Sequence, residues 1–446
     1  MAMFLSKTSP ALGPSRSSIS ISRGRPASQA TAARVFIEST LRVTFVSVQS
    51  HILTIARLVH LDFHWALVCC TTGFQFQQTS KPVNMSLDEL RKNLSNVDRR
   101  LIEMIAERQH IVADISKTKL SSGAGTRDYA REKDVLNMGR DHAAELGIDP
   151  DLVENFLQML IRTSLETQER ERVVAEGKGD GRRVLVIGGA GKMGRWFVDF
   201  FASQGFATTI ADTTIEDGPA QFRNWTDAGV DFDVIVVAAP LAVSGRILAQ
   251  LAVLKPKGLV FDIGSLKSPL IDGLKELRAA GCKVASIHPM YGPGTRLLSG
   301  RHLIFCDVGD AEATAAAKEL FAATMVEQLD MGLDDHDRLI AYVLGLSHAL
   351  NIAFFTALAE SGEAAPKLAQ MSSTTFDSQL LVAAAVAQDN PHMYFEIQNL
   401  NKFGLGPLDA LCEAAGRIRE TVASGDEEAF VKLMQKGRDY LAQRRQ

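Results

Sequence analysis

Glycines with a characteristic spacing provide the first chemical signal in the sequence. Gly189, Gly191 and Gly194 form the pattern GxGxxG, between a run of aliphatic residues and a helical pattern that contains Lys192 and Met193. This spacing allows a tight turn, close approach of the backbone to a pyrophosphate and close packing of the helix, whose N-terminus attracts anions. We therefore expect all five residues to contribute to a dinucleotide site.

An acidic residue narrows the choice of dinucleotide. Asp212 ends the second predicted strand, 18 residues after Gly194. A carboxylate at this place accepts hydrogen bonds from the adenosine ribose and repels a 2′-phosphate. The expected cofactor is therefore NAD rather than NADP.

Two later predicted strands end in residues that could handle a proton. Ser265 lies in DIGSLKS and His288 in IHPMYGP. Open α/β sheets bind ligands at the carboxyl ends of their strands. A histidine there can accept the proton of an alcohol while the hydride leaves for a nicotinamide. A lone histidine also fits a structural role, but the nearby serine and nucleotide site favour hydride transfer.

The elements that must position these residues change in kind along the chain. Apolar residues recur at a 3.5-residue spacing from Ser86 to about Leu120, which predicts a long amphipathic helix. A second helix is predicted over residues 129–146. The segment 147–151 starts a third, which ends near residue 171 and precedes the flexible linker 177–181. This first domain is assigned to residues 85–176.

Short β-branched runs then alternate with helical stretches over residues 182–333, which predicts a doubly wound α/β domain. Residues 334–446 give helical patterns alone. The fold class is thus multi-domain, with helices first, a Rossmann-like domain next and an all-α domain last. The strands are predicted over 182–188, 207–212, 233–240, 258–264, 283–289 and 302–307, and near 329.

Residues 1–84 differ from the rest in composition. They contain eight of the 48 Lys and Arg residues and two of the 52 acidic residues, which leaves a formal charge of −10 on residues 85–446. The composition of this segment is typical of an organelle transit peptide. A translation start at Met85 explains the abrupt change better, and the expected location of the protein is then cytoplasmic.

The composition of the chain also excludes several kinds of partner. The net negative charge of residues 85–446 argues against binding of nucleic acid. The apolar stretch 43–70 is interrupted by charged and histidine residues, so we expect no membrane span there. Five cysteines without a CxxC motif predict no metal site.

The segments GGAGKMGRWF, DIGSLKS and IHPMYGPGTRLLSG resemble the prephenate dehydrogenase family. The resemblance implies that His288 is catalytic and that Ser265 supports the nicotinamide and the substrate hydroxyl. Oxidation of the ring alcohol of prephenate drives decarboxylation to 4-hydroxyphenylpyruvate. Such an enzyme needs a base, a hydride acceptor and cations that bind two carboxylates.

One position departs from the family pattern. Similar proteins carry Arg-His in the first long helix after the Rossmann domain, whereas this chain has Ser347 followed by His348. The resemblance still implies that His348 binds substrate, while the residue that binds the ring carboxylate is open. Arg296 and Lys402 are the candidates, with a surface role as the alternative for each. Arogenate is also open as a substrate.

Residues 86–170 resemble the all-α chorismate mutase domain. On helices that turn by about 100° per residue, Arg108 and Lys119 share a face, whereas Arg91 lies roughly 100° away from Arg108. In the family this arginine comes from the partner subunit of an intertwined dimer. The residues that match the family are Arg91, Arg108, Lys119, Asp128, Arg131, Glu132, Ser164 and Gln168.

The resemblance also implies a role for each kind of residue. The rearrangement of chorismate needs no nucleophile, only a bound reactive conformer and stabilisation of charge on the breaking ether. Arginines would bind the carboxylates, Lys119 and Gln168 would donate to the ether oxygen, and Glu132 would bind the ring hydroxyl.

Together these resemblances imply a homodimeric, bifunctional enzyme of tyrosine biosynthesis that acts on chorismate and prephenate with NAD and has tyrosine as a possible inhibitor. One alternative is a dehydrogenase whose mutase-like helices only dimerise or bind an effector. Another is a β-hydroxyacid oxidoreductase, which would have no reason to carry the mutase residues.

Overall fold

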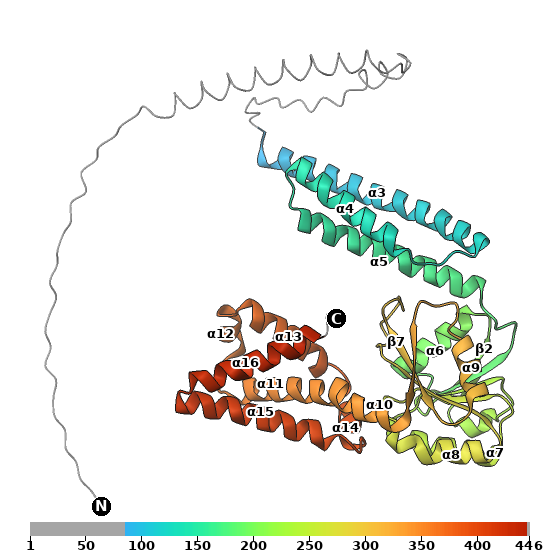
Figure 1. Ribbon diagram of the computed structural model, residues 1–446. Coiled ribbons are helices and arrows are strands. Elements are labelled where there is room, and N and C mark those ends of the chain that lie inside the picture. Colours follow the sequence, from blue (N-terminus) through green and yellow to red (C-terminus); the bar gives the residue numbers. More distant parts are fainter. Residues whose placement is uncertain (1–84, 444–446) are drawn as a thin grey trace, which may run out of the picture. The chain divides into compact units, whose positions relative to one another are not determined.

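The computed structural model describes residues 85–443, so the expectations for residues 1–84 lie outside the described part. Three helices come first: α3 (Leu87–Ser122), α4 (Tyr129–Leu146) and α5 (Pro150–Ala175) (Figure 1). Local signals fix their ends. Gly147 ends α4 in a left-handed conformation with φ 69°, and the Asp149 side chain caps α5, whose first residue is a proline. The three predicted helices are therefore present with nearly the predicted bounds.

The α/β domain contains one sheet with the order β3-β2-β1-β4-β5-β6-β7-β8. Its neighbouring strands are parallel except β6 and β7, which are antiparallel. The two-residue strand β3 was not predicted, because two residues give no pattern. The bounds are β1 (Arg183–Ile187), β2 (Ala207–Ala211), β3 (Gln221–Phe222), β4 (Val234–Val237), β5 (Leu259–Asp262), β6 (Lys283–Pro289), β7 (His302–Asp307) and β8 (Glu327–Gly332).

Helices cover both faces of this sheet (Figure 1). On β1, Val184 and Val186 belong to one buried core and Leu185 and Ile187 to the other. Because both faces are buried, the strands are continuously apolar instead of alternating with polar residues. The doubly wound prediction is confirmed. The intervening helices are α6 (Lys192–Ser203), η1 (Trp225–Ala228), α7 (Leu241–Leu254), η2 (Ser268–Leu270), α8 (Ile271–Ala279) and α9 (Ala311–Glu319).

The last part of the described chain is helical, as predicted. A short π-helix, η3, which the sequence pattern did not indicate, precedes Ser347. A small core that includes Leu241, Leu266, Ile340 and Ile397 joins these helices to the α/β domain. The elements are α10 (Leu333–Ile340), η3 (Ala341–Leu346), α11 (Ser347–Glu360), α12 (Ala365–Gln370), α13 (Thr374–Ala387), α14 (Pro391–Asn399), α15 (Leu405–Ser424) and α16 (Glu427–Ala442).

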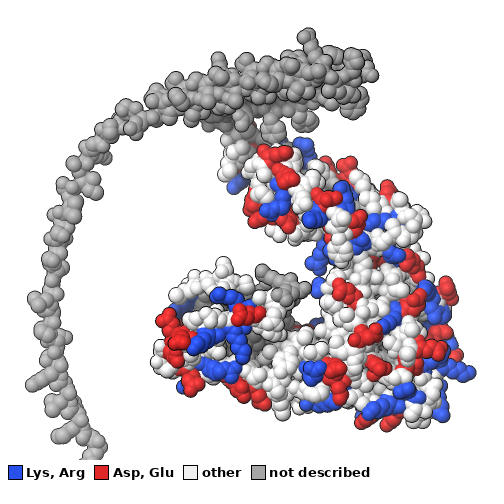
Figure 2. Space-filling view, in the orientation of Figure 1, with Lys and Arg blue, Asp and Glu red and all other residues white. Residues whose placement is uncertain are grey.

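Two surface properties bear on function. On the face drawn in Figure 2, Lys and Arg are interspersed with Asp and Glu. Among the described residues, the stretch Leu333–Glu360 is long and apolar enough to cross a membrane, with a mean hydropathy of 1.6 and 22% burial of its most apolar window. Length and composition alone are weak evidence for a membrane span, since core helices of soluble proteins share both.

Candidate active sites

The glycine-rich turn has the geometry that a dinucleotide loop requires. Gly191 caps α6 directly after β1, and a Cβ on Gly194 would lie 2.1 Å from the carbonyl oxygen of Gly188. Only glycine therefore allows this helix to pack so closely on the strand. The Asp212 carboxylate, which follows β2, accepts a hydrogen bond from the backbone N–H of Ala190 at 3.1 Å. The loop, the open N-terminus of α6 and this carboxylate together fit NAD.

The two side chains that follow Gly191 have different surroundings. Met193 is partly buried against the core on the α6 face of the sheet. The Lys192 ammonium is exposed and lies 3.1 Å from the Asp389 carboxylate, between α13 and α14. The nucleotide loop thus meets the C-terminal helices, and sequence reasoning did not identify Asp389.

His288 lies on β6 and is almost completely buried, with 5% of its surface exposed. Its Nδ1 lies 2.8 Å from Nε2 of His336, and Nδ1 of His336 lies 2.8 Å from Oδ1 of Asp337. Both partners belong to α10 and are fully buried. Sequence reasoning missed them, because the polar run that they share with Asp334, Asp335 and Arg338 looks like an exposed helical surface.

A buried ion pair lies beside this histidine. The Lys267 ammonium donates to Oδ2 of Asp262 at 2.6 Å and to the carbonyl oxygen of Ile287 at 2.8 Å. Burial lowers the pKa of His288 well below its ordinary range, and the neighbouring His336 and the Lys267 charge lower it further. His288 is therefore neutral near pH 7, the state in which an imidazole accepts a proton.

Ser265 is half-buried in the turn after β5, the strand paired with β6. The backbone N–H of Gly264 in the same turn donates to Oδ2 of Asp262 at 2.8 Å. The structure thus places Ser265 in the turn after β5 and His288 near the end of the neighbouring strand β6.

The candidates for binding substrate carboxylates have different surroundings. The Ser347 hydroxyl donates to the Val343 carbonyl oxygen of its own helix at 2.8 Å. Lys402 lies 2.6 Å from the Asp334 carboxylate, whereas Arg296 is exposed. The His348 ring lies 4.3 Å from the Tyr394 ring, measured between centroids. Its Nδ1 is buried and has no hydrogen-bond partner in the described part of the chain, as expected for an atom that awaits a ligand.

Four of the predicted mutase residues line the seam between α3 and α5. Arg108 donates from Nη1 to the Ser164 hydroxyl at 2.5 Å, and burial lowers its pKa. Farther along, Lys119 and Gln168 line one small pocket with Thr126, whose carbonyl oxygen accepts from the Lys119 ammonium at 2.6 Å. Lys119 and Gln168 therefore share one small pocket, whereas Arg108 contacts α5 at Ser164, outside the lining of that pocket.

Gln168 has an unsatisfied polar atom in this pocket. Its side chain is 8% exposed, and Oε1 has no hydrogen-bond partner among residues 85–443. A buried amide without a partner is costly, so it points to a polar ligand group at this place.

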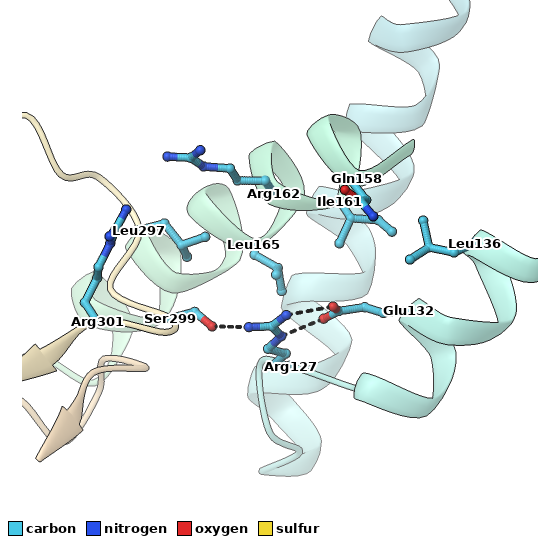
Figure 3. Close-up of a pocket in the computed structure, with 10 residues that line it drawn as sticks. All are labelled: Arg127, Glu132, Leu136, Gln158, Ile161, Arg162, Leu165, Leu297, Ser299 and Arg301. Carbon is cyan, nitrogen blue, oxygen red and sulfur yellow. Dashed lines mark hydrogen bonds and ion pairs between the residues drawn. The ribbon is translucent and has the colours of Figure 1, made fainter. Parts of the chain in front are cut away.

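Glu132 does not face the seam. Arg127 binds its carboxylate through two hydrogen bonds of 2.9 Å and also donates to the Ser299 hydroxyl at 2.6 Å (Figure 3). These three residues line a second pocket, formed by α4, α5 and the segment 297–301. Sequence reasoning identified neither Arg127 nor Ser299.

The other mutase candidates have surface positions in the structure. The Asp128 carboxylate caps α4 by accepting from the backbone N–H of Arg131 at 3.0 Å. Arg91 and Arg131 are exposed. The structure thus brings Arg108 to Ser164 and Lys119 to Gln168 along one seam. It leaves Arg91, Asp128 and Arg131 exposed and pairs Glu132 with Arg127.

The chain matches three family models. Residues 90–169 match chorismate mutase type II. Residues 213–327 match the nucleotide-binding domain of prephenate dehydrogenase, and residues 333–436 match its dimerization domain. The second match begins after the glycine-rich turn, so that turn is identified by its own sequence and geometry.

Two proteins of similar sequence match this chain over most of their length. The T-protein of Enterobacter agglomerans is 26% identical over 77% of this chain and 90% of that protein. The T-protein of Haemophilus influenzae is 22% identical over 80% of this chain and 92% of that protein. A crystal structure of A. aeolicus prephenate dehydrogenase with hydroxyphenyl propionate and NAD+ has 18% identity and a TM-score of 0.46, over 59% of this chain and 98% of that one. The chain combines a type II chorismate mutase domain with the nucleotide-binding and dimerization domains of prephenate dehydrogenase.

Proposed function

We propose that this chain converts chorismate to prephenate and then oxidises prephenate, with loss of CO2, to 4-hydroxyphenylpyruvate. One observation carries the proposal: the same chain contains the α3–α5 seam with Arg108, Lys119 and Gln168 and a buried neutral histidine on the sheet whose first strand leads into the glycine-rich loop. Either site alone would support only half of the reaction sequence.

The mutase step needs charge complementarity and no covalent chemistry. Arg108 would bind a carboxylate of chorismate, and the Lys119 ammonium would stabilise negative charge on the breaking ether. The NH2 group of Gln168 would donate a second hydrogen bond to that oxygen. Ser164 holds the Arg108 guanidinium in place through its hydroxyl.

In the dehydrogenase step, His288 would accept the proton of the ring hydroxyl. NAD, when bound along Gly189, Gly191 and Gly194, supplies the hydride acceptor. Burial keeps His288 neutral before the reaction, so it can take the proton. The half-buried Ser265 would orient the substrate hydroxyl toward this histidine. The carboxylate that leaves as CO2 needs a cation, for which Arg296 is the exposed candidate.

We further propose that two copies form a homodimer. Helix α3 exposes a stripe of apolar residues, including Leu94, Leu101 and Met104 at 62%, 47% and 64% exposure. A second copy on this stripe would remove it from water and would place Arg91 at the site of the partner subunit. The exposed apolar residues of Leu333–Glu360 would lie in the same dimer. A chain that sediments as a monomer with full mutase turnover would contradict this.

The first experiment measures NADH formation with NAD and either prephenate or chorismate. We expect both substrates to give NADH. Arg108→Ala should abolish NADH formation from chorismate and keep it from prephenate, whereas His288→Asn should abolish both and keep the rearrangement of chorismate. Tyrosine, added to the same assay, tests the inhibition that the family resemblance implies.

Each failure has a distinct meaning. NADH from prephenate alone would reduce the α3–α5 helices to a dimerisation or effector module. Absence of NADH with both substrates, followed by NADH from arogenate, would change the substrate and keep the dehydrogenase.

A further inference from the structure

We infer that His336 and Asp337 are positioning residues that determine which ring nitrogen of His288 carries a proton. The inference deepens the proposed dehydrogenase function and rests on it for its kinetic test. It is carried by a buried chain of hydrogen bonds that connects these three residues.

The chain of hydrogen bonds ends at the Asp337 carboxylate, which can only accept hydrogen bonds. Oδ1 of Asp337 accepts from the backbone N–H of Lys267 at 2.8 Å, and Oδ2 accepts from the backbone N–H and hydroxyl of Ser268 at 2.5 Å. Burial raises the pKa of Asp337, but the hydrogen bonds from His336 and Ser268 outweigh it and lower the pKa below its ordinary value. Asp337 is therefore ionised near pH 7.

The ionised Asp337 carboxylate determines which ring nitrogen of His336 carries the proton. Nδ1 of His336 lies 2.8 Å from Oδ1 of Asp337, so it must carry the proton, because two lone pairs at that distance would repel. Burial lowers the pKa of His336, which keeps the ring neutral despite the carboxylate. A neutral ring with a proton on Nδ1 has a lone pair on Nε2.

The lone pair of His336 in turn determines which ring nitrogen of His288 carries the proton. Nε2 of His336 can only accept, so Nδ1 of His288 carries the proton across their 2.8 Å contact. The lone pair of His288 then resides on Nε2. That nitrogen is the one left to accept the proton of the substrate.

The other ionisable groups around His288 do not change this arrangement of protons. The Lys267 ammonium and the Asp262 carboxylate are paired with each other at 2.6 Å and fully buried. Cys306, on the adjacent strand β7, is buried, and burial raises its pKa to about 12. The Cys306 thiol is therefore neutral near pH 7 and does not compete with Asp337 as a negatively charged acceptor.

The kinetic test replaces Asp337, the last residue in the chain of hydrogen bonds. In the Asp337→Asn variant the new amide could donate to His336, which would reverse both tautomers and place the proton of His288 on Nε2. We expect this substitution to lower the dehydrogenase kcat by about 10³–10⁴-fold, by analogy with orienting carboxylates of catalytic histidines, and to leave KM for prephenate and NAD nearly unchanged. Mutase turnover of the same chain reports correct folding.

Two further substitutions separate tautomer control from a structural role. Asp335→Asn, on the same helix but exposed and paired with Arg338, is the matched control and should keep full activity. His336→Gln provides an oxygen that can accept from His288, and should keep more activity than His336→Leu, which has no acceptor. A kcat for Asp337→Asn within about threefold of the unaltered chain, or a change in KM alone, would overturn the inference.

A second readout needs no substrate. In the ¹⁵N spectrum of histidine-labelled full chain, the resonances lost in His288→Asn assign His288, and their shifts report the neutral tautomer. We expect the proton on Nδ1 in the unaltered chain and on Nε2 in Asp337→Asn. A proton on Nε2 in the unaltered chain would overturn the inference even if prephenate is oxidised. The expected spectrum together with no oxidation would instead count against the proposed function.

Discussion

Glu169 and Leu298 connect the mutase helices to the dehydrogenase domain. Oε2 of Glu169 accepts from the backbone N–H of Leu298 at 2.7 Å, and Oε1 accepts from that of Met325 at 2.5 Å. Glu169 is buried and follows Gln168 on α5, and Leu298 lies in the segment that leads from His288 to β7. The Glu169 carboxylate therefore holds α5 against the segments that precede β7 and β8.

Glu169→Gln should destabilise the protein. An amide has one acceptor oxygen, so its NH2 group would face one of the two backbone N–H groups. We expect a loss of about 1–3 kcal/mol in the free energy of unfolding, measured by urea denaturation. Glu166→Gln, one turn earlier on α5, is the matched control and should cost about 0.5 kcal/mol or less. Equal effects of the two substitutions would show that the connection contributes nothing.

Gln168→Glu should make the mutase dependent on acid. Gln168 needs no proton to donate to the ether oxygen, so the unaltered mutase should keep its activity above neutral pH. The carboxyl group of the variant could donate only when protonated, and once ionised it would repel the developing negative charge. We expect the variant to lose mutase turnover as pH rises and to regain it on acidification, with unchanged oxidation of prephenate. A variant with the flat pH profile of the parent would contradict the role of Gln168.

The dehydrogenase should remain active below the ordinary pKa of histidine. Because burial lowers the pKa of His288 well below 6.5, kcat/KM for prephenate should stay level through that pH and fall only at lower values. Stability follows the same sign: the unfolded chain binds more protons below pH 6.5, so the folded protein loses stability as pH falls toward the folded-state pKa. An activity limb centred at or above pH 6.5 would contradict this prediction.

Breaking the pair of Lys267 and Asp262 should be costly. Both side chains are fully buried, so Lys267→Met leaves an uncompensated carboxylate. We expect a loss of about 3–5 kcal/mol in the free energy of unfolding, and a smaller loss when Asp262→Asn is added. Lys367→Met breaks the exposed pair with Glu363 and should cost about 0–1 kcal/mol. A double variant as unstable as the sum of its two single changes would contradict the pairing.

Local chemistry let the sequence predict the elements and the nucleotide loop. Helices α3, α4 and α5 follow from apolar spacing and end at residues such as Gly147, whose left-handed conformation suits glycine. The GxGxxG turn needs no information from afar, because Gly194 packs against Gly188 only six residues earlier. The strand ends of β5 and β6 likewise indicated Ser265 and His288.

Only the tertiary structure decided which side chains meet. His336 lies 48 residues from His288 in the chain, and no spacing rule joins them. Glu132 lies at the expected helical position, yet its carboxylate binds Arg127, a pairing that the helical spacing did not indicate. The sequence alone determined the main helices and strands and the loop, since these depend on neighbouring residues, whereas β3 and η3 gave no pattern. The packing of elements determined the partners of each buried polar group, since those partners come from distant parts of the chain.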